Sequence, residues 1–161
     1  MRSIYKLVVC SLLTLSITSC EKDLLEKEQY QKEIYLIGAY NRVWTTEVSY
    51  SNEEVKTYFT VSSSGTLALD RDVNVKMKIN EELVDIYNRK YWTVLNEDKY
   101  YKSLDTDLYS IPSLENTVIK HAEGISAEVP VLIKTASLKI DQSYVIPVEI
   151  ESTTGYPIST S

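Results

Sequence analysis

The chain has 161 residues and a net charge of −6 at pH 7, from 17 Lys and Arg against 23 Asp and Glu. This length allows one domain, and so acidic a chain without a basic stripe argues against nucleic acid as a partner. Tyr is abundant, with 13 residues against one Phe and two Trp. Tyr is typical of strands and of positions with one hydrated end, and it also forms flat platforms against sugar rings.

The first residues, MRSIYKLVVCSLLTLSITSC, predict a signal peptide over residues 1–19. Arg2 and Lys6 form a basic start, and the apolar run 7–17 is shorter than the about 20 residues that cross a membrane. The last four residues, an aliphatic one, two small ones and Cys20, resemble the bacterial lipobox. We therefore expect Cys20 to be lipidated and to become the mature N-terminus.

Lipidation would anchor the protein to a membrane, because two or three acyl chains hold firmly where one holds only marginally. Cys10 leaves with the signal and Cys20 carries the lipid, so the folded part has no thiol. Disulfides, zinc–thiolate sites and a Cys nucleophile are thereby excluded. Residues 20–33 are predicted to form the lipidated Cys and a charged tether, either a short helix or a solvated segment.

From residue 34 the pattern predicts strands. The runs IYLIGAY and VKTYFTV are strand-like, and the second leads into SSSG, which is typical of a turn. DVNVKMKI is the clearest strand, because its apolar and polar residues alternate strictly, as one buried face requires. The apolar members are Val73, Val75, Met77 and Ile79.

One short helix is predicted near residues 80–88, NEELVDIYN. Asn80 is a suitable N-cap, the two glutamates that follow complement the helix dipole, and Asn88 can end the helix. Three apolar side chains at helical spacing form one face: Leu83, Ile86 and Tyr87.

Two later runs, EVPVLIK and YVIPVEI, are also strand-like. Each contains a proline, Pro130 or Pro147, which cannot donate to a ladder and therefore indicates edge strands or bulges. Four side chains of the second run are expected to share a face: Tyr144, Ile146, Val148 and Ile150. Short strands, frequent turns and one helix predict a mainly β fold, an Ig-like antiparallel β-sandwich over residues 34–161.

Several phrases of the chain resemble a domain of unknown function in Bacteroidetes surface lipoproteins. They are DVNVKMKINEELVDIYN, WTVLNEDKYY, SAEVPVLIK and SYVIPVEIESTTGYPI. In that family the domain commonly follows the lipidated Cys and precedes glycoside hydrolase or carbohydrate-binding domains. The resemblance runs from about Ile34 to Ile158 and implies an Ig-like β-sandwich with a role in surface glycan capture. It supplies no catalytic residues.

The resemblance also bears on location and extent. Glu21-Lys22-Asp23 is similar to the export signals of surface lipoproteins in that phylum, so we expect an outer-membrane protein that faces outward. The run 155–158 is expected to turn into another strand shortly before the sequence stops. The chain is then either a stand-alone adaptor or a truncated product of a longer gene, with its last strand complete or missing.

Catalysis is not expected. The one His, His121, lies in a turn-like stretch and lacks the sequence context of a nucleophile. The Asp pairs 70/72 and 105/107 are interpreted as turn residues rather than as glycosidase carboxylates or calcium ligands. No metal and no cofactor are predicted.

Four aromatic residues are candidates for glycan binding: Tyr91, Trp92, Tyr100 and Tyr109. Polar side chains at 88, 96 and 98 lie near them in sequence and could bind sugar hydroxyls. In an alternative interpretation Trp92 fills the core, and Tyr101 occupies a position that looks structural in the family. The sequence thus predicts a non-catalytic surface lipoprotein, a spacer or weak glycan binder. The alternatives are an adhesion or pilus-type subunit and a truncated remnant of a larger glycan-active protein.

Overall fold

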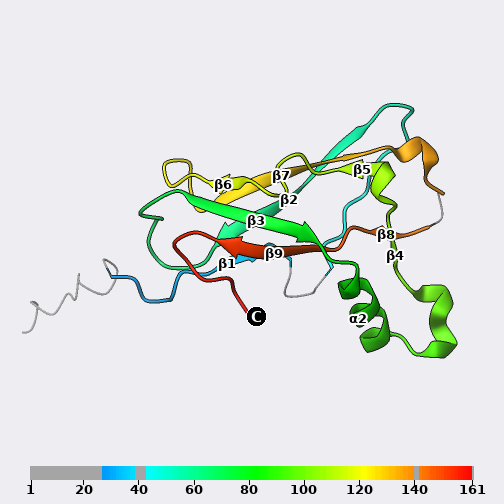
Figure 1. Cartoon of the computed structure of the whole chain (residues 1–161), viewed down its shortest axis with the longest axis horizontal. Coiled ribbons are helices and arrows are strands. Elements are labelled where there is room, and N and C mark those ends of the chain that lie inside the picture. The colour runs from blue at the N-terminus through cyan, green and yellow to red at the C-terminus, as the bar shows by residue number, and fades with distance from the viewer. Residues whose placement is uncertain (1–26, 39–42, 140–141, 161) are drawn as a thin grey trace, which may run out of the picture.

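The computed structural model describes residues 27–38, 43–139 and 142–160, and shows two antiparallel sheets packed face to face (Figure 1). The larger sheet has the order β1 (Ile34–Leu36), β2 (Val55–Ser63), β7 (Ser126–Ile133), β5 (Tyr109–Ser110). The smaller sheet has the order β6 (Thr117–Ile119), β3 (Val73–Ile79), β9 (Val148–Thr153). The predicted mainly β, antiparallel sandwich is confirmed.

The remaining elements lie at one end of the sandwich. Helix α2 (Glu82–Tyr91) follows β3, and the 3₁₀ helix η2 (Val94–Lys99) follows α2 (Figure 1). A short parallel pair joins β4 (Lys102–Ser103) to β8 (Tyr144–Val145). Two further 3₁₀ helices are η3 (Thr106–Leu108) and η4 (Thr135–Ser137). Within the described ranges α2 is the one α-helix, as the sequence predicts.

The main core lies between the two sheets. The predicted alternation of β3 is confirmed, because Val73, Val75 and Met77 are at most 1% exposed while the residues between them face solvent. They meet inward side chains of the larger sheet, which alternate in the same way on the facing strands. These partners are Ile34, Val61 and Val129. Burial of this apolar surface is the main stabilising contribution to the sandwich.

The predicted SSSG turn begins later than expected. Ser62 and Ser63 continue β2 and are 3% and 1% exposed. Their hydroxyls can be buried because both find backbone acceptors: Ser62 Oγ donates to the Ile125 carbonyl at 3.2 Å and Ser63 Oγ to the Ser64 carbonyl at 2.8 Å. The turn follows at Gly65, whose φ of 113° favours glycine.

Helix α2 is longer than predicted and presents a different face. The Asn80 side chain does accept a hydrogen bond at the start, from the Glu82 N–H at 3.2 Å. Ile86 is 48% exposed, and Val84 rather than Ile86 packs inward beside Leu83 and Tyr87. Asn88 does not end the helix, because its side chain is bonded to another segment, as described below.

The two prolines differ in their settings. Pro147 separates β8 from β9, so the predicted strand YVIPVEI is two strands in two different sheets. Because proline has no N–H the ladder stops there, and the Pro147 carbonyl instead accepts from the Asn80 N–H at 2.9 Å. Pro130 lies in β7, which stands between β2 and β5 in the larger sheet. The prediction that Pro130 marks an edge strand is therefore wrong. The neighbour β5 pairs only with Leu132 and Ile133, which leaves one side of Pro130 without a ladder partner.

Both ends of the described chain meet the edge of the sandwich. Lys32 donates to the Leu67 carbonyl at 2.7 Å, so the tether region from Glu28 onward contacts the loop after β2. At the other end the Ile34 N–H donates to the Pro157 carbonyl at 2.8 Å, and the Ser159 N–H to the Ile34 carbonyl at 2.9 Å. The expected turn at 155–158 therefore leads to a short parallel bridge on β1.

Residues 43–54 form no helix or strand. Thr135, which is 3% exposed, fixes this segment by a reciprocal pair of hydrogen bonds. Its Oγ1 accepts from the Ser51 N–H at 2.9 Å and donates to the Ser51 carbonyl at 3.2 Å. One side chain thus holds two backbone groups of a segment that is distant in sequence.

Thr135→Val keeps the side-chain shape but removes both hydrogen bonds. We expect the free energy of unfolding to fall by about 1–3 kcal/mol, because the Ser51 backbone groups lose their partner. Urea unfolding followed by circular dichroism measures this, with the exposed Thr106→Val as the matched control. Equal midpoints for the two variants would contradict the anchoring role of Thr135.

Candidate functional site: two clefts beside Tyr101

Tyr101 is held in place by Asn88. The Asn88 side-chain amide donates to the Tyr101 carbonyl at 2.9 Å, and its oxygen accepts from the Tyr101 N–H at 2.9 Å. Asn88 is 4% exposed, so water competes little for these bonds. The Tyr87 ring lies 5.5 Å from that of Tyr101 and 4.5 Å from that of Tyr91, and burial raises the pKa of Tyr87. The chain after η2 is thus fixed against α2.

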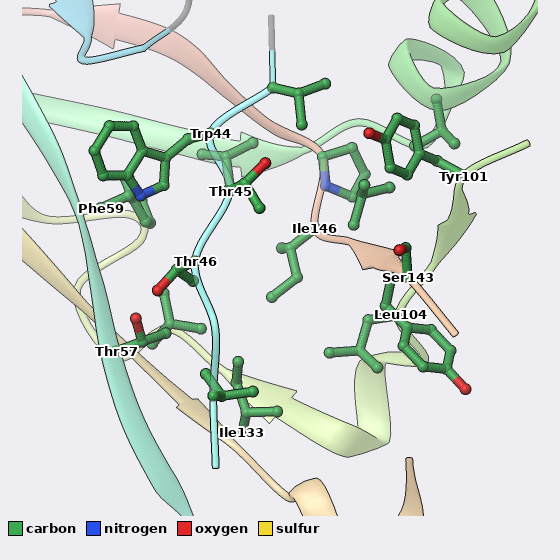
Figure 2. Close-up of a pocket in the computed structure, with 18 of the residues that line it drawn as sticks. Trp44, Thr45, Thr46, Thr57, Phe59, Tyr101, Leu104, Ile133, Ser143 and Ile146 are labelled. Carbon is green, nitrogen blue, oxygen red and sulfur yellow. The ribbon is translucent and has the colours of Figure 1, made fainter. Parts of the chain in front are cut away.

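A large cavity of about 1000 Å³ lies on one side of Tyr101. Figure 2 shows the first part of segment 43–54 running across it, with Trp44, Thr45 and Thr46 opposite Thr57 and Phe59 of β2. Its inner wall is a second hydrophobic cluster, separate from the main core. This second core is centred on Leu104, Val131 and Ile133.

Tyr101 also lines a smaller cleft of about 610 Å³. This volume falls within the range of about 300–1,000 Å³ that is typical of small-molecule sites. The small cleft combines three kinds of side chain: the aromatic Trp92, Tyr100 and Tyr101, the uncharged polar Gln142 and Ser143, and the charged Asp98, Lys99, Lys102 and Lys139.

The four aromatic candidates divide between these places. Trp92 and Tyr100 line the small cleft, and Tyr91, which is 49% exposed, lines the large cavity. Tyr109 packs against the second core, and its buried hydroxyl has no hydrogen-bond partner in the described ranges. Burial, and to a lesser extent the charge of Glu81, raises the pKa of Tyr109. The structure thus brings together two of the four residues, and their binding of glycans stays a prediction.

Trp92 is held at the boundary between interior and cleft. Its Nε1 is buried, with no acceptor among the residues that the structure describes. The Lys99 Nζ lies 5.7 Å from the centroid of the indole ring, which is within the distance for a cation–π contact. Trp92 therefore lines the small cleft through atoms other than its N–H donor.

Three members of the small cleft could not be inferred from local sequence. Lys139, Gln142 and Ser143 belong to a segment about forty residues after Tyr101. The parallel pairing of Lys102 with Tyr144 brings this segment beside η2. A pairing of two residues per strand leaves no periodicity in the sequence that could predict it.

The acidic pairs considered for catalysis have other partners. Asp70 accepts two hydrogen bonds from the Arg71 guanidinium, at 2.9 and 3.0 Å, and one from the Tyr156 hydroxyl. The Arg71 hydrogen bond is the largest cause that lowers the pKa of Asp70. Asp105 accepts from the Asp107 N–H at 3.1 Å at the start of η3, as a turn residue does.

His121 lies in an exposed loop against Asp72. The Asp72 carboxylate accepts from the His121 N–H at 3.0 Å and lies 2.6 Å from the ring Nδ1. This contact lowers the pKa of Asp72.

The described residues contain no group of three or more His, Cys, Asp and Glu that could hold a metal ion. Nor does any described helix have the length and apolar character to cross a membrane.

Comparison with known proteins identifies the class. Residues 30–157 match the model of a family of N-terminal domains, described as "-like, N-terminal domain", and the chain belongs to this family. It shares its fold with a crystal structure of a protein of unknown function from Bacteroides ovatus, with a TM-score of 0.57 at 12% identity over 82% of this chain. It also resembles a multidomain protein including DUF1735 from Bacteroides ovatus, with a TM-score of 0.53 at 17% identity over 63% of this chain.

The resemblance to a Bacteroidetes domain of unknown function is thereby confirmed. The chain covers 42% of the first of these proteins and 33% of the second, so it corresponds to part of each. No curated protein matches the chain.

Proposed function

We propose that this protein is a non-catalytic accessory domain of a cell-surface glycan-acquisition lipoprotein, and that it binds glycans weakly through the small cleft. One observation carries the proposal: Trp92 and Tyr100 line the same cleft as Asp98, Gln142 and Ser143. Aromatic surface can contact the apolar face of a sugar ring, and the polar side chains supply donors and acceptors for its hydroxyls.

Two features favour binding without hydrolysis. Asp98 is the one carboxylate among the described residues that line the small cleft, whereas most glycosidases use two facing carboxylates. The other acidic pairs considered do not line this cleft and include an ion pair and a turn. A cleft with one carboxylate suits recognition better than bond cleavage.

The location follows from the N-terminal sequence. Lipidation at Cys20 would anchor the protein to the outer membrane, and the acidic-plus-Lys start would direct it outward. The multidomain relative supports a role as a module that spaces or assists another domain. In this arrangement the domain keeps a partner module away from the membrane while it contacts polysaccharide.

A structural assembly subunit is the second candidate. Strand β1 pairs only with Val61–Ser63 of β2. The β1-facing edge of β2 from Val55 to Phe59 therefore has no strand partner among the described residues, although its other edge pairs with β7. Such an edge can accept a strand from another chain. Lys56 lies on this edge and disfavours pairing, so we rank assembly below glycan binding. Concentration-dependent oligomers in light scattering would reverse this order.

A titration of residues 21–161, which contain every described element, with a panel of polysaccharides tests the proposed function. We expect tryptophan fluorescence to change with at least one glycan. Trp92→Ala should abolish this response, and Trp44→Ala, which removes the other tryptophan, should retain it. A folded protein whose emission is indifferent to every glycan would contradict binding and leave the spacer role alone.

A further inference from the structure

We propose that the small cleft selects anionic glycans, whose sugars carry a carboxylate or a sulfate group. This inference rests on the proposed function and specifies its ligand class. The observation behind it is the presence of three lysines, Lys99, Lys102 and Lys139, around one cleft that contains a single described carboxylate, Asp98.

This concentration of positive charge is unusual for the molecule. The chain as a whole carries a net charge of −6, and several lysines elsewhere on the described surface are paired with carboxylates. The Nζ–Oε distances in three such pairs are 2.7 Å for Lys76 with Glu151, 3.5 Å for Lys78 with Glu149 and 2.8 Å for Lys120 with Glu123.

The lysines of the cleft have no comparable partner. Within the described ranges none of the three forms an ion pair, and the Lys99 Nζ lies over the Trp92 ring. Like charges that line one cleft raise the local concentration of anions. An anionic group between these side chains would relieve their mutual repulsion.

The residue types match an acidic sugar. Each lysine supplies three N–H donors and a compact positive charge, which binds a carboxylate or a sulfate. Trp92 and Tyr100 offer ring surface to the sugar, and Gln142 can bind a hydroxyl. A neutral glycan would leave the lysines unused, and a simple anion would leave the aromatic rings unused.

A glycan fits this surface better than a nucleic acid does. Duplex DNA carries one negative charge per about 1.7 Å of its axis, so its long backbone would meet the acidic remainder of this protein. In an acidic polysaccharide the charges are spaced along the chain by sugar rings, and only the part within the cleft needs compensation. Its sparser charge tolerates the acidic surroundings.

The test uses residues 21–161 and two matched pairs of polymers, measured by isothermal titration calorimetry. Polygalacturonate is compared with its methyl-esterified form, and dextran sulfate with dextran. We expect the charged member of at least one pair to bind about tenfold more tightly than its neutral partner. The first pair identifies a carboxylate ligand and the second a sulfate ligand. Binding should weaken as sodium chloride rises, because salt screens exposed charges.

Two variants with equal loss of charge locate the site. Lys99→Gln with Lys102→Gln should weaken binding of the charged polymer about tenfold. Lys76→Gln with Lys120→Gln, in β3 and directly after β6, should leave it unchanged. Circular dichroism confirms that both variants fold.

Three results would overturn the inference. Equal binding of neutral and charged glycans would leave the proposed function standing and remove only the charge selection. Equally tight binding of polyglutamate, which has no sugar rings, would show that the cleft attracts any polyanion and does not select glycans. Absence of binding by all four polymers and by the wider glycan panel would contradict both the inference and the proposed function.

Discussion

Replacing Met77 with alanine is expected to lower the free energy of unfolding by about 2–5 kcal/mol, because truncation of a buried methionine loses transfer energy and leaves a cavity. Met77 is fully buried and lies between the two sheets. It also stands where the pairing of β3 with β9 shifts register, between Lys76 and Met77. Because both sheets enclose this position, the surrounding side chains can fill little of the cavity that the truncation leaves.

Urea unfolding measures the effect of Met77→Ala, and Lys76→Ala is the matched control on the neighbouring, exposed position. The control should leave the free energy of unfolding nearly unchanged, because exposed ion pairs such as Lys76–Glu151 contribute little. A loss below about 1 kcal/mol for Met77→Ala would mean that the two sheets do not enclose this side chain.

Asn88→Ala is expected to lower the free energy of unfolding by about 2–4 kcal/mol, because two hydrogen bonds are lost and two backbone groups of Tyr101 are left without partners. Asn88 is the buried residue of α2, and its side chain joins the helix to the chain after η2. Loss of this connection should also displace Tyr101, which lines both clefts.

Two readouts separate these effects. Thermal unfolding gives the loss of stability, and glycan titration below the unfolding temperature gives the loss of binding. Asn74→Ala, at an exposed position of β3, is the matched control and should change neither. An Asn88→Ala protein with unchanged stability would show that the two hydrogen bonds to Tyr101 do not form in solution.

Strands with one buried face could be predicted from the sequence. In β3 the alternation of Val73, Val75 and Met77 with polar residues is a direct consequence of burial on one side. The fold class and the existence of α2 could be predicted for the same reason, because periodic patterns encode the faces that pack.

Other features depend on partners that are distant in the chain. Ser62 belongs to a run that is typical of a turn, yet it is buried in β2 because the distant Ile125 carbonyl accepts a hydrogen bond from its hydroxyl. Asn88 reads as a helix end, yet its two hydrogen bonds to Tyr101 let the helix continue. Local propensity therefore predicts the wrong local structure where a polar side chain has a long-range partner.

The candidate site was predictable only in part. The run from Tyr91 to Tyr101 is rich in aromatic residues, and this local signal includes Trp92 and Tyr100. The signal fails for Tyr109, because β5 directs this residue to the second core. It also misses Lys139, because only the pairing of β4 with β8 brings that lysine beside η2.

The most direct test of glycan binding in the small cleft uses the two tryptophan side chains. Trp44 lines the large cavity and Trp92 the small cleft, so the indole resonance of each reports, through the ring that carries it, on one of the two sites. In ¹H–¹⁵N spectra of residues 21–161, we expect a bound glycan to shift the Trp92 indole resonance and leave that of Trp44 in place. A shift confined to Trp44, or none in either residue at saturating glycan, would contradict the account.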